Sequence, residues 1–103
     1  MSQAEPKTRT KPGIQLAEPP MYKVIYINDD KTAMEFVIDS LVEHFEYTFT
    51  TAEQITVDIH QSGSAVVAVL PYEVAEQKGI EITVSARSEG YPLQIKLEPE
   101  AAT

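Results

Sequence analysis

Residues 21–37, MYKVIYINDDKTAMEFV, contain the boundary on which the fold depends. Residues 22–27 are rich in β-branched and aromatic side chains, which is typical of a largely buried strand. An amide and two carboxylates, at residues 28–30, then interrupt the apolar run before a second apolar run begins. The stretch therefore predicts a strand, a polar break and a helix in quick succession.

The second apolar run predicts an amphipathic helix over residues 33–46. Thr32 and Glu35 fit a capping box, in which the threonine oxygen accepts from a backbone N–H and the glutamate reaches back to the cap. The apolar residues that follow recur at helical spacing. They are Phe36, Val37, Leu41 and Phe45.

A second capping box, at residues 51–54, predicts a further, shorter helix. Ile55 and Ile59 fall on one face of this helix, and Gly63 suits a left-handed helix end. The continuous apolar run of residues 65–70 then predicts the central strand of a sheet.

The last third of the chain gives conflicting signals. Residues 79–84 alternate in polarity as a strand does, whereas a longer set of residues keeps helical register. That set consists of Val74, Lys78, Ile82 and Ala86. Pro71 suits a helix start and Gly90 a helix exit, so the spacing favours one helix over residues 72–88. Residues 93–97 alternate cleanly and predict the third strand.

These elements predict an α+β domain, in which a three-stranded antiparallel sheet carries three helices in the order β-α-α-β-α-β. The length of 103 residues is sufficient for one domain. Residues 1–20 hold four of the seven prolines and no aromatic residue, which predicts a flexible N-terminal extension. The core domain is then expected over residues 21–100, with a disordered tail at residues 101–103.

Negative charge dominates the predicted core. Residues 21–103 contain fourteen acidic and five basic side chains, and the whole chain has a net charge of −8. Such a surface repels phosphate, so neither nucleic acid nor an anionic membrane is expected as a partner. Cysteine is absent, no apolar run approaches the roughly 20 residues that span a bilayer, and the N-terminus lacks an apolar signal segment. We expect a soluble, cytoplasmic protein.

The polar break at residues 28–30 admits three interpretations. It is a turn whose negative charge favours the next helix, a carboxylate pair for acid–base catalysis, or a set of acceptors for a bound ammonium group. Taken alone, it is best interpreted as a turn. The sequence has no serine elbow, phosphate-binding glycine loop or thiol, and His44 and His60 are too few for a metal site. We therefore predict that the protein is not an enzyme and binds no metal or other cofactor.

In combination, these features resemble the ClpS family of bacterial N-degron adaptors. The resemblance covers about four-fifths of the chain. The run Asn-Asp-Asp-x-Thr-x-Met-Glu-Phe-Val, followed by a histidine and by Glu-Val-Ala-Glu, is specific as a set although each piece alone is weak. The matching positions are residues 19–24, 28–30, 32, 34–37, 60, 63, 73–76, 78, 86–87 and 92–93.

The resemblance implies an adaptor that performs no bond chemistry. Members of the family bind proteins whose first residue is bulky and apolar, typically Leu, Phe, Tyr or Trp, and hand them to the unfoldase ClpA or ClpC. By position, the free α-amino group of such a substrate would be bound by Asn28, Asp29 and His60. Its side chain would enter a pocket lined by Asp30, Thr32, Met34, Val37, Thr56, Ile59 and Leu93. The N-terminal domain of the unfoldase would dock at Glu73 and Lys78.

One departure from the family concerns the pocket. Most members have methionine where this chain has Thr56. Threonine is shorter, stiffer and more polar than methionine. We therefore expect a different pocket shape and an altered preference among first residues.

An alternative interpretation is an interaction module of similar shape, such as the C-terminal domain of the ribosomal stalk protein. That interpretation would leave Asn28, Asp29 and His60 without a ligand. A third, a small hydrolase, would require turnover or metal dependence. The adaptor interpretation instead implies a monomer, whose residues 1–20 engage the unfoldase during delivery.

Overall fold

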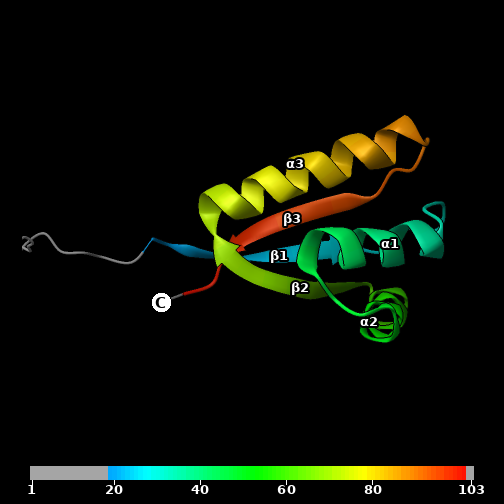
Figure 1. Ribbon diagram of the computed structural model, residues 1–103, viewed down its shortest axis with the longest axis horizontal. Helices are drawn as coiled ribbons and strands as arrows, with labels where there is room; N and C mark the ends of the chain where they lie inside the picture. The colour runs from blue at the N-terminus through cyan, green and yellow to red at the C-terminus, as the bar shows by residue number, and fades with distance from the viewer. Residues whose placement is uncertain (1–18, 102–103) are drawn as a thin grey trace, which may run out of the picture.

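The computed structural model describes residues 19–101. The predicted flexible extension and disordered tail therefore lie almost wholly outside the described residues. The predicted order of elements, β-α-α-β-α-β, is confirmed (Figure 1). The elements are β1 Met21–Ile27, α1 Met34–Phe45, α2 Phe49–Ser62, β2 Ser64–Pro71, α3 Tyr72–Ser88 and β3 Gln94–Pro99.

The central strand of the antiparallel sheet is β1, because the strand order is β2-β1-β3. The prediction that residues 65–70 form the central strand is wrong. In β2, Val67 is buried on one face, whereas Val66 and Val69 are 49% and 38% exposed on the other. The continuous apolar run thus reflects a strand with apolar side chains on both faces. It does not show whether the strand is hydrogen-bonded to a neighbour along one edge or both.

The hydrophobic core lies between the helices and one face of the sheet. Val24 and Tyr26 of β1 are fully buried, as are Leu41 of α1 and Ile82 of α3. Burial of alternate strand residues is expected of an antiparallel sheet covered on one face. In Figure 1, α3 runs beside β3, while α1 and α2 pack together where β1 ends. The end of β1 is therefore the point at which the sheet meets two helices.

The predicted capping box at the start of α1 is not formed. The N-cap residue is Ala33, and no side chain caps the helix. The Thr32 hydroxyl instead donates to Asp29 Oδ2 at 2.8 Å. The Thr32 hydroxyl is thus hydrogen-bonded to the Asp29 carboxylate of the turn and does not cap α1.

The second helix begins earlier than predicted. Thr48 is the N-cap of α2, and its Oγ1 accepts from the Thr51 N–H at 3.2 Å. Thr51, the predicted cap, lies inside the first turn, and α2 has 14 residues against 12 in α1, so it is not the shorter helix. The predicted end is correct, because Gly63 adopts a left-handed φ of 92°.

The conflicting signals in α3 are decided in favour of one helix over residues 72–88, as predicted. Ala75, Ile82 and Ala86 are fully buried on its inner face. Burial of that apolar stripe outweighs the local strand preference of residues 79–84, because tertiary packing supplies most of a helix's stability.

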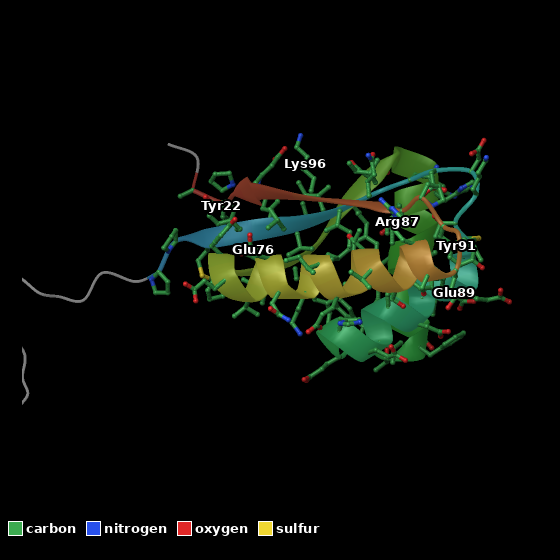
Figure 2. The ribbon with its side chains drawn as sticks, turned by 90° about the horizontal axis from the view of Figure 1, so that it is seen from above. Tyr22, Glu76, Arg87, Glu89, Tyr91 and Lys96 are labelled. Atoms are coloured by element: carbon green, nitrogen blue, oxygen red, sulfur yellow. The ribbon has the colours of Figure 1, made fainter. Side chains whose placement is uncertain are left out.

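The connection from α3 to β3 is fixed by Arg87, which Figure 2 shows beside β3. Its Nη1 donates to the carbonyl oxygens of Tyr91 and Leu93, at 2.9 and 2.8 Å. The Tyr91 ring packs edge-on against Phe36 of α1, with centroids 5.4 Å apart. Leu93 was predicted to begin the third strand, but it precedes β3 and is buried in this connection.

Candidate functional site

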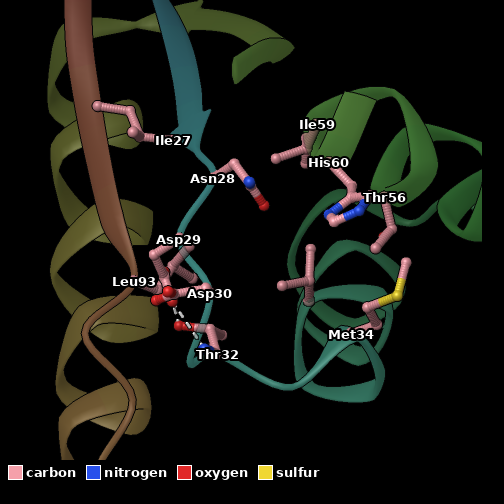
Figure 3. A pocket seen from close by; sticks show the side chains of 11 residues that line it. Ile27, Asn28, Asp29, Asp30, Thr32, Met34, Thr56, Ile59, His60 and Leu93 are labelled. Atoms are coloured by element: carbon pink, nitrogen blue, oxygen red, sulfur yellow. Dashed lines mark hydrogen bonds between the residues drawn. The ribbon is translucent and has the colours of Figure 1, made fainter. Parts of the chain in front are cut away.

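A pocket of about 240 Å³ opens where β1 ends, between α1 and α2 (Figure 3). The structure brings together in it every residue that was predicted for the amine site and for the apolar pocket. The lining residues are Ile27, Asn28, Asp29, Asp30, Thr32, Met34, Val37, Thr56, Ile59, His60 and Leu93. Ile27 was not predicted, and its position directly before Asn28 was the available signal.

Asn28 and His60 are positioned by one backbone junction. The Asn28 N–H donates to the Gly63 carbonyl oxygen at 2.9 Å, and the Gly63 N–H donates to that of Ile59, also at 2.9 Å. The first residue of the polar break is thereby fixed to the end of α2. Figure 3 shows the Asn28 side chain directed towards the part of α2 that carries His60 and Thr56.

Asp29 organises the polar break. Its Oδ1 accepts from the backbone N–H groups of Lys31 and Thr32 at 2.8 and 2.7 Å, and its Oδ2 accepts from the Thr32 hydroxyl. Burial raises the pKa of Asp29, but these three hydrogen bonds, together with the charge of Arg87, outweigh it and lower the pKa below its usual value. Asp29 is therefore ionised at neutral pH. Because a carboxylate oxygen has two acceptor positions, Oδ2 keeps one position for a ligand or a water molecule.

The floor of the pocket, defined as Val37, Thr56, Ile59 and Leu93, is part of the protein core. These side chains are between 2% and 7% exposed. The Thr56 hydroxyl donates to the Ala52 carbonyl oxygen at 2.8 Å, inside α2. That pairing satisfies the polar atom of Thr56, so the floor presents apolar groups to a ligand.

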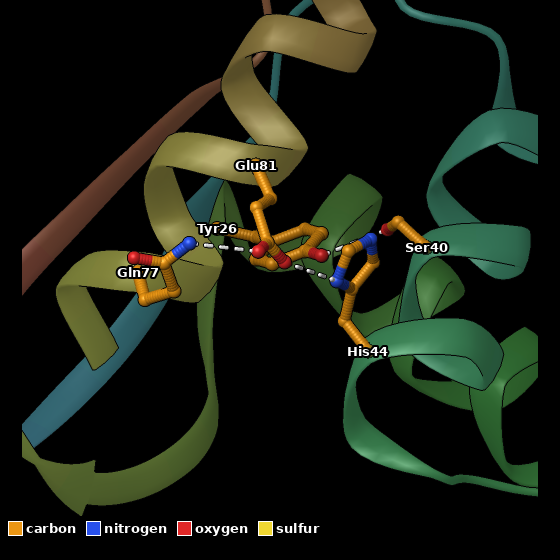
Figure 4. Close-up of polar contacts among 5 residues, drawn as sticks. All are labelled: Tyr26, Ser40, His44, Gln77 and Glu81. Atoms are coloured by element: carbon orange, nitrogen blue, oxygen red, sulfur yellow. Dashed lines mark hydrogen bonds and ion pairs between the residues drawn. The ribbon is translucent and has the colours of Figure 1, made fainter. Parts of the chain in front are cut away.

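A hydrogen-bonded chain links β1 to α1 through Tyr26 and Ser40 (Figure 4). The Ser40 hydroxyl donates to the Val37 carbonyl oxygen at 2.7 Å, so it accepts from the Tyr26 hydroxyl, also at 2.7 Å. Burial raises the pKa of Tyr26, which keeps its hydroxyl protonated. The central strand thus holds the backbone of a floor residue in place.

The rim of the pocket, defined as Asn28, Asp30, Met34 and His60, is exposed to solvent. Met34 is the first residue of α1 and is 47% exposed. Its unbranched thioether side chain adapts readily to the shape of a neighbour. The rim therefore combines polar acceptors with one flexible apolar group above an apolar floor.

Glu73 and Lys78, predicted for unfoldase docking, lie on α3 and outside the pocket. Glu73 is exposed in the first turn of α3. Lys78 is half-buried, with Nζ 5.8 Å from the centre of the Phe45 ring. At about 100° per residue, five positions separate these side chains by roughly 140° around the helix. The two residues therefore lie on different faces of α3.

The pocket can bind a ligand that carries N–H donors next to an apolar side chain. The rim and Asp29 supply oxygen and imidazole acceptors, and the floor supplies apolar contact. Within residues 19–101, no group of three or more His, Cys, Asp or Glu side chains could hold a metal ion. The helices in this part of the chain are all too short or too polar to cross a membrane.

Comparison with known proteins shows the same family throughout. Residues 17–96 match the family described as ATP-dependent Clp protease adaptor protein ClpS. The ClpS adapter of Campylobacter jejuni strain RM1221 is 40% identical over 92% of this chain and 99% of its own. ClpS 1 of Rhodopseudomonas palustris is 41% identical over 93% of each chain. The structure of Agrobacterium tumefaciens ClpS2 bound to L-phenylalaninamide is 38% identical and superposes with a TM-score of 0.77, covering 81% of this chain and all of that one.

The fold and these matches define an adaptor protein and not an enzyme. The chain belongs to the ClpS family, whose members are adaptors of the ATP-dependent Clp protease. The predicted resemblance and the predicted absence of enzymatic activity are confirmed. Family membership also excludes the two alternative interpretations, a module like the ribosomal stalk domain and a small hydrolase.

Proposed function

We propose that this chain binds proteins with a bulky, apolar N-terminal residue (Leu, Phe, Tyr or Trp) and delivers them to a Clp unfoldase for degradation. One observation carries the proposal. Asn28, Asp29 and His60 place acceptors beside one pocket whose floor is buried and apolar. A chain end likewise offers an amine beside a side chain, because both are attached to one Cα atom.

The proposed acceptors distinguish a free α-amino group from an acetylated or internal residue. This group is largely protonated at neutral pH, since its pKa is about 7.7–8.0, and it then offers three donors. The Asn28 amide oxygen, the free position on Asp29 Oδ2 and a neutral His60 nitrogen are the proposed acceptors. An acetylated or internal residue lacks that charge and most of those donors. It would leave polar groups unpaired, which costs on the order of 1–3 kcal/mol for each buried group.

The floor supplies the second part of the affinity. Burying a Leu or Phe side chain contributes roughly 1.5–3 kcal/mol. The Agrobacterium tumefaciens relative supports this part of the proposal, because L-phenylalaninamide combines a free α-amino group with an aromatic side chain. Thr56, whose hydroxyl is already paired, is proposed to set the shape of the floor and hence the preference among side chains.

Delivery requires a second surface that contacts the unfoldase. We assign Glu73 and Lys78 to docking on the N-terminal domain of ClpA or ClpC, and the extension at residues 1–20 to engagement during delivery. In this proposal the adaptor acts as a monomer in the cytoplasm. The unfoldase and the substrate then occupy separate surfaces, since Glu73 and Lys78 lie outside the pocket.

A peptide titration tests the proposed function. A labelled peptide beginning with Phe should bind, its N-acetylated twin should not, and a peptide with one extra residue before the Phe should bind weakly. The three peptides share the same aromatic group, so any difference reports recognition of the chain end. Equal binding of the free and acetylated peptides, or binding of neither, would remove the proposal.

A further inference from the structure

Two apolar residues on α3 have no role in the core. Ile80 and Val84 are 54% and 63% exposed, and Val84 is the most exposed large apolar side chain of residues 19–101. Both are β-branched, and β-branched side chains lose rotamer freedom in a helix, so they are unfavourable there unless packing compensates. They belong to the segment of residues 79–84 whose alternation resembles a strand, so neither helix formation nor core packing accounts for them.

The two residues share one face of α3 with Glu73. Positions seven apart lie on nearly the same side of a helix, and positions four apart are neighbours along it. Glu73, Ile80 and Val84 therefore form a line along the outer side of the helix. Lys78 lies on a different face, against Phe45.

A shallow apolar groove runs beside this line, between α3 and β3. Ile80 and Val84 form its helical wall, and Ile95 and Leu97 form its strand wall. Gly79 lies between the walls without a side chain, and a Cβ built there would be 3.8 Å from Ile95 Cγ2. The missing side chain keeps the groove open. Figure 2 shows Glu76 near one end of this boundary and Arg87 near the other.

The free charge around the groove is negative. The two cations of α3 are engaged within the protein: Lys78 lies over the Phe45 ring, and Arg87 donates to two backbone carbonyl groups. Glu76 lines the groove and Glu73 is exposed on the same helix, whereas Glu81 is paired with His44 of α1 and does not line the groove. A partner for this groove therefore needs an apolar side chain bordered by basic residues. A second copy of the chain would bring like charges together.

We propose that Ile80 and Val84, in line with Glu73, form the apolar centre of the surface that docks the Clp unfoldase, receiving an apolar side chain bordered by basic residues. The inference rests on the proposed function and deepens it. Glu73 supplies the charged edge of this surface. The groove adds the apolar contact area that Glu73 and Lys78 alone do not provide. Exposed apolar side chains bordered by polar groups are typical of such an interface.

The test uses the full chain and its full-length cognate Clp unfoldase. The double variant I80A/V84A removes the apolar wall but improves helix propensity, so its melting temperature should equal or exceed that of the unmodified protein. Its affinity for the unfoldase should fall about tenfold or more. Val66→Thr is the matched control, since Val66 is 49% exposed on β2, away from α3. L-phenylalaninamide binding is measured separately on each protein and should not change.

The outcomes separate this inference from the proposed function. Loss of unfoldase affinity in I80A/V84A, with Val66→Thr unaffected, supports the groove. Unchanged affinity in I80A/V84A, when Glu73→Ala weakens docking, overturns the groove and leaves docking in place. An unmodified protein that binds no unfoldase removes both. Self-association of the unmodified protein that disappears in I80A/V84A would identify a second copy as the occupant and also overturn the inference.

Discussion

The floor and the rim of the pocket differ in what else their residues do. Val37, Ile59 and Leu93 in the floor are core residues, buried together with Val24 and Tyr26 of the central strand. Asn28, Asp30 and His60 in the rim are exposed and support no part of the core. A change in the floor should therefore alter stability and affinity together, whereas a change in the rim should alter affinity alone. This separation lets each half of the proposed recognition be tested by itself.

The largest effect is expected in the floor. Leu93→Ala should lower the free energy of unfolding by about 2–5 kcal/mol, the range for truncating a buried leucine. It should also abolish measurable binding of a Phe-initiated peptide, because the cavity removes contact with the ligand side chain. Urea denaturation and peptide titration measure the two effects. A destabilised variant that still folds and keeps full affinity would show that Leu93 belongs to the core only.

Asp29 belongs to neither the floor nor the rim, and it has two roles: it orders the turn after β1, and it borders the proposed amine site. Asp29→Asn keeps an oxygen for the Lys31 and Thr32 N–H groups, but it removes the charge and the Oδ2 atom that accepts from the Thr32 hydroxyl. Peptide affinity should therefore fall about tenfold, with a smaller loss of stability than in Asp29→Ala. Asp29→Ala also removes the hydrogen bonds of the turn and should lower both quantities. Identical affinity in Asp29→Asn and the unmodified protein would restrict Asp29 to ordering the turn.

Rim substitutions should show affinity loss without destabilisation. Asn28→Ala and His60→Ala should each weaken binding of a Phe-initiated peptide by about tenfold, since each removes one proposed acceptor. The melting temperature should stay close to that of the unmodified protein because both side chains are exposed. Asp58→Ala, an exposed α2 position that is absent from the pocket lining, is the matched control. Equal losses at Asp58 and His60 would point to a general effect of α2.

A smaller effect is expected from pH. Protonated His60 would be a cation beside the bound ammonium group, so affinity should fall several-fold as the pH is lowered from about 7 to about 5, a range in which the α-amino group of the peptide stays protonated. Asp29 does not contribute in this window: its pKa is lowered in the folded protein, so it stays ionised until the pH falls through that value. Titration of the unmodified protein and of His60→Ala separates the groups. A slope that persists in His60→Ala would assign the effect elsewhere.

The difference between buried and exposed residues also explains which features could be predicted from the sequence. Helical spacing identified α3 because Ile82 and Ala86 are core residues whose periodicity reflects burial. The capping box at Thr32 misled because competition from Asp29 depends on the turn, which the motif does not describe. The central position of β1 was missed because strand order is set by long-range pairing. The rim residues came from resemblance to a family, since exposed residues leave no periodic pattern.

Thr56 provides the most demanding test, because it is the floor residue that is proposed to set the preference among side chains. Its hydroxyl is paired with Ala52, and methionine at this position would lose that bond but extend a flexible apolar chain into the pocket. Thr56→Met should therefore change the affinity ranking of peptides that begin with Leu, Phe, Trp, Ile and Val, by factors of several-fold, with the largest losses for the bulkiest or β-branched residues. Because all five peptides share the same amine, their contacts with Asn28, Asp29 and His60 cancel in the ranking. An unchanged ranking would mean that the rim, through Met34, and not the floor sets the preference.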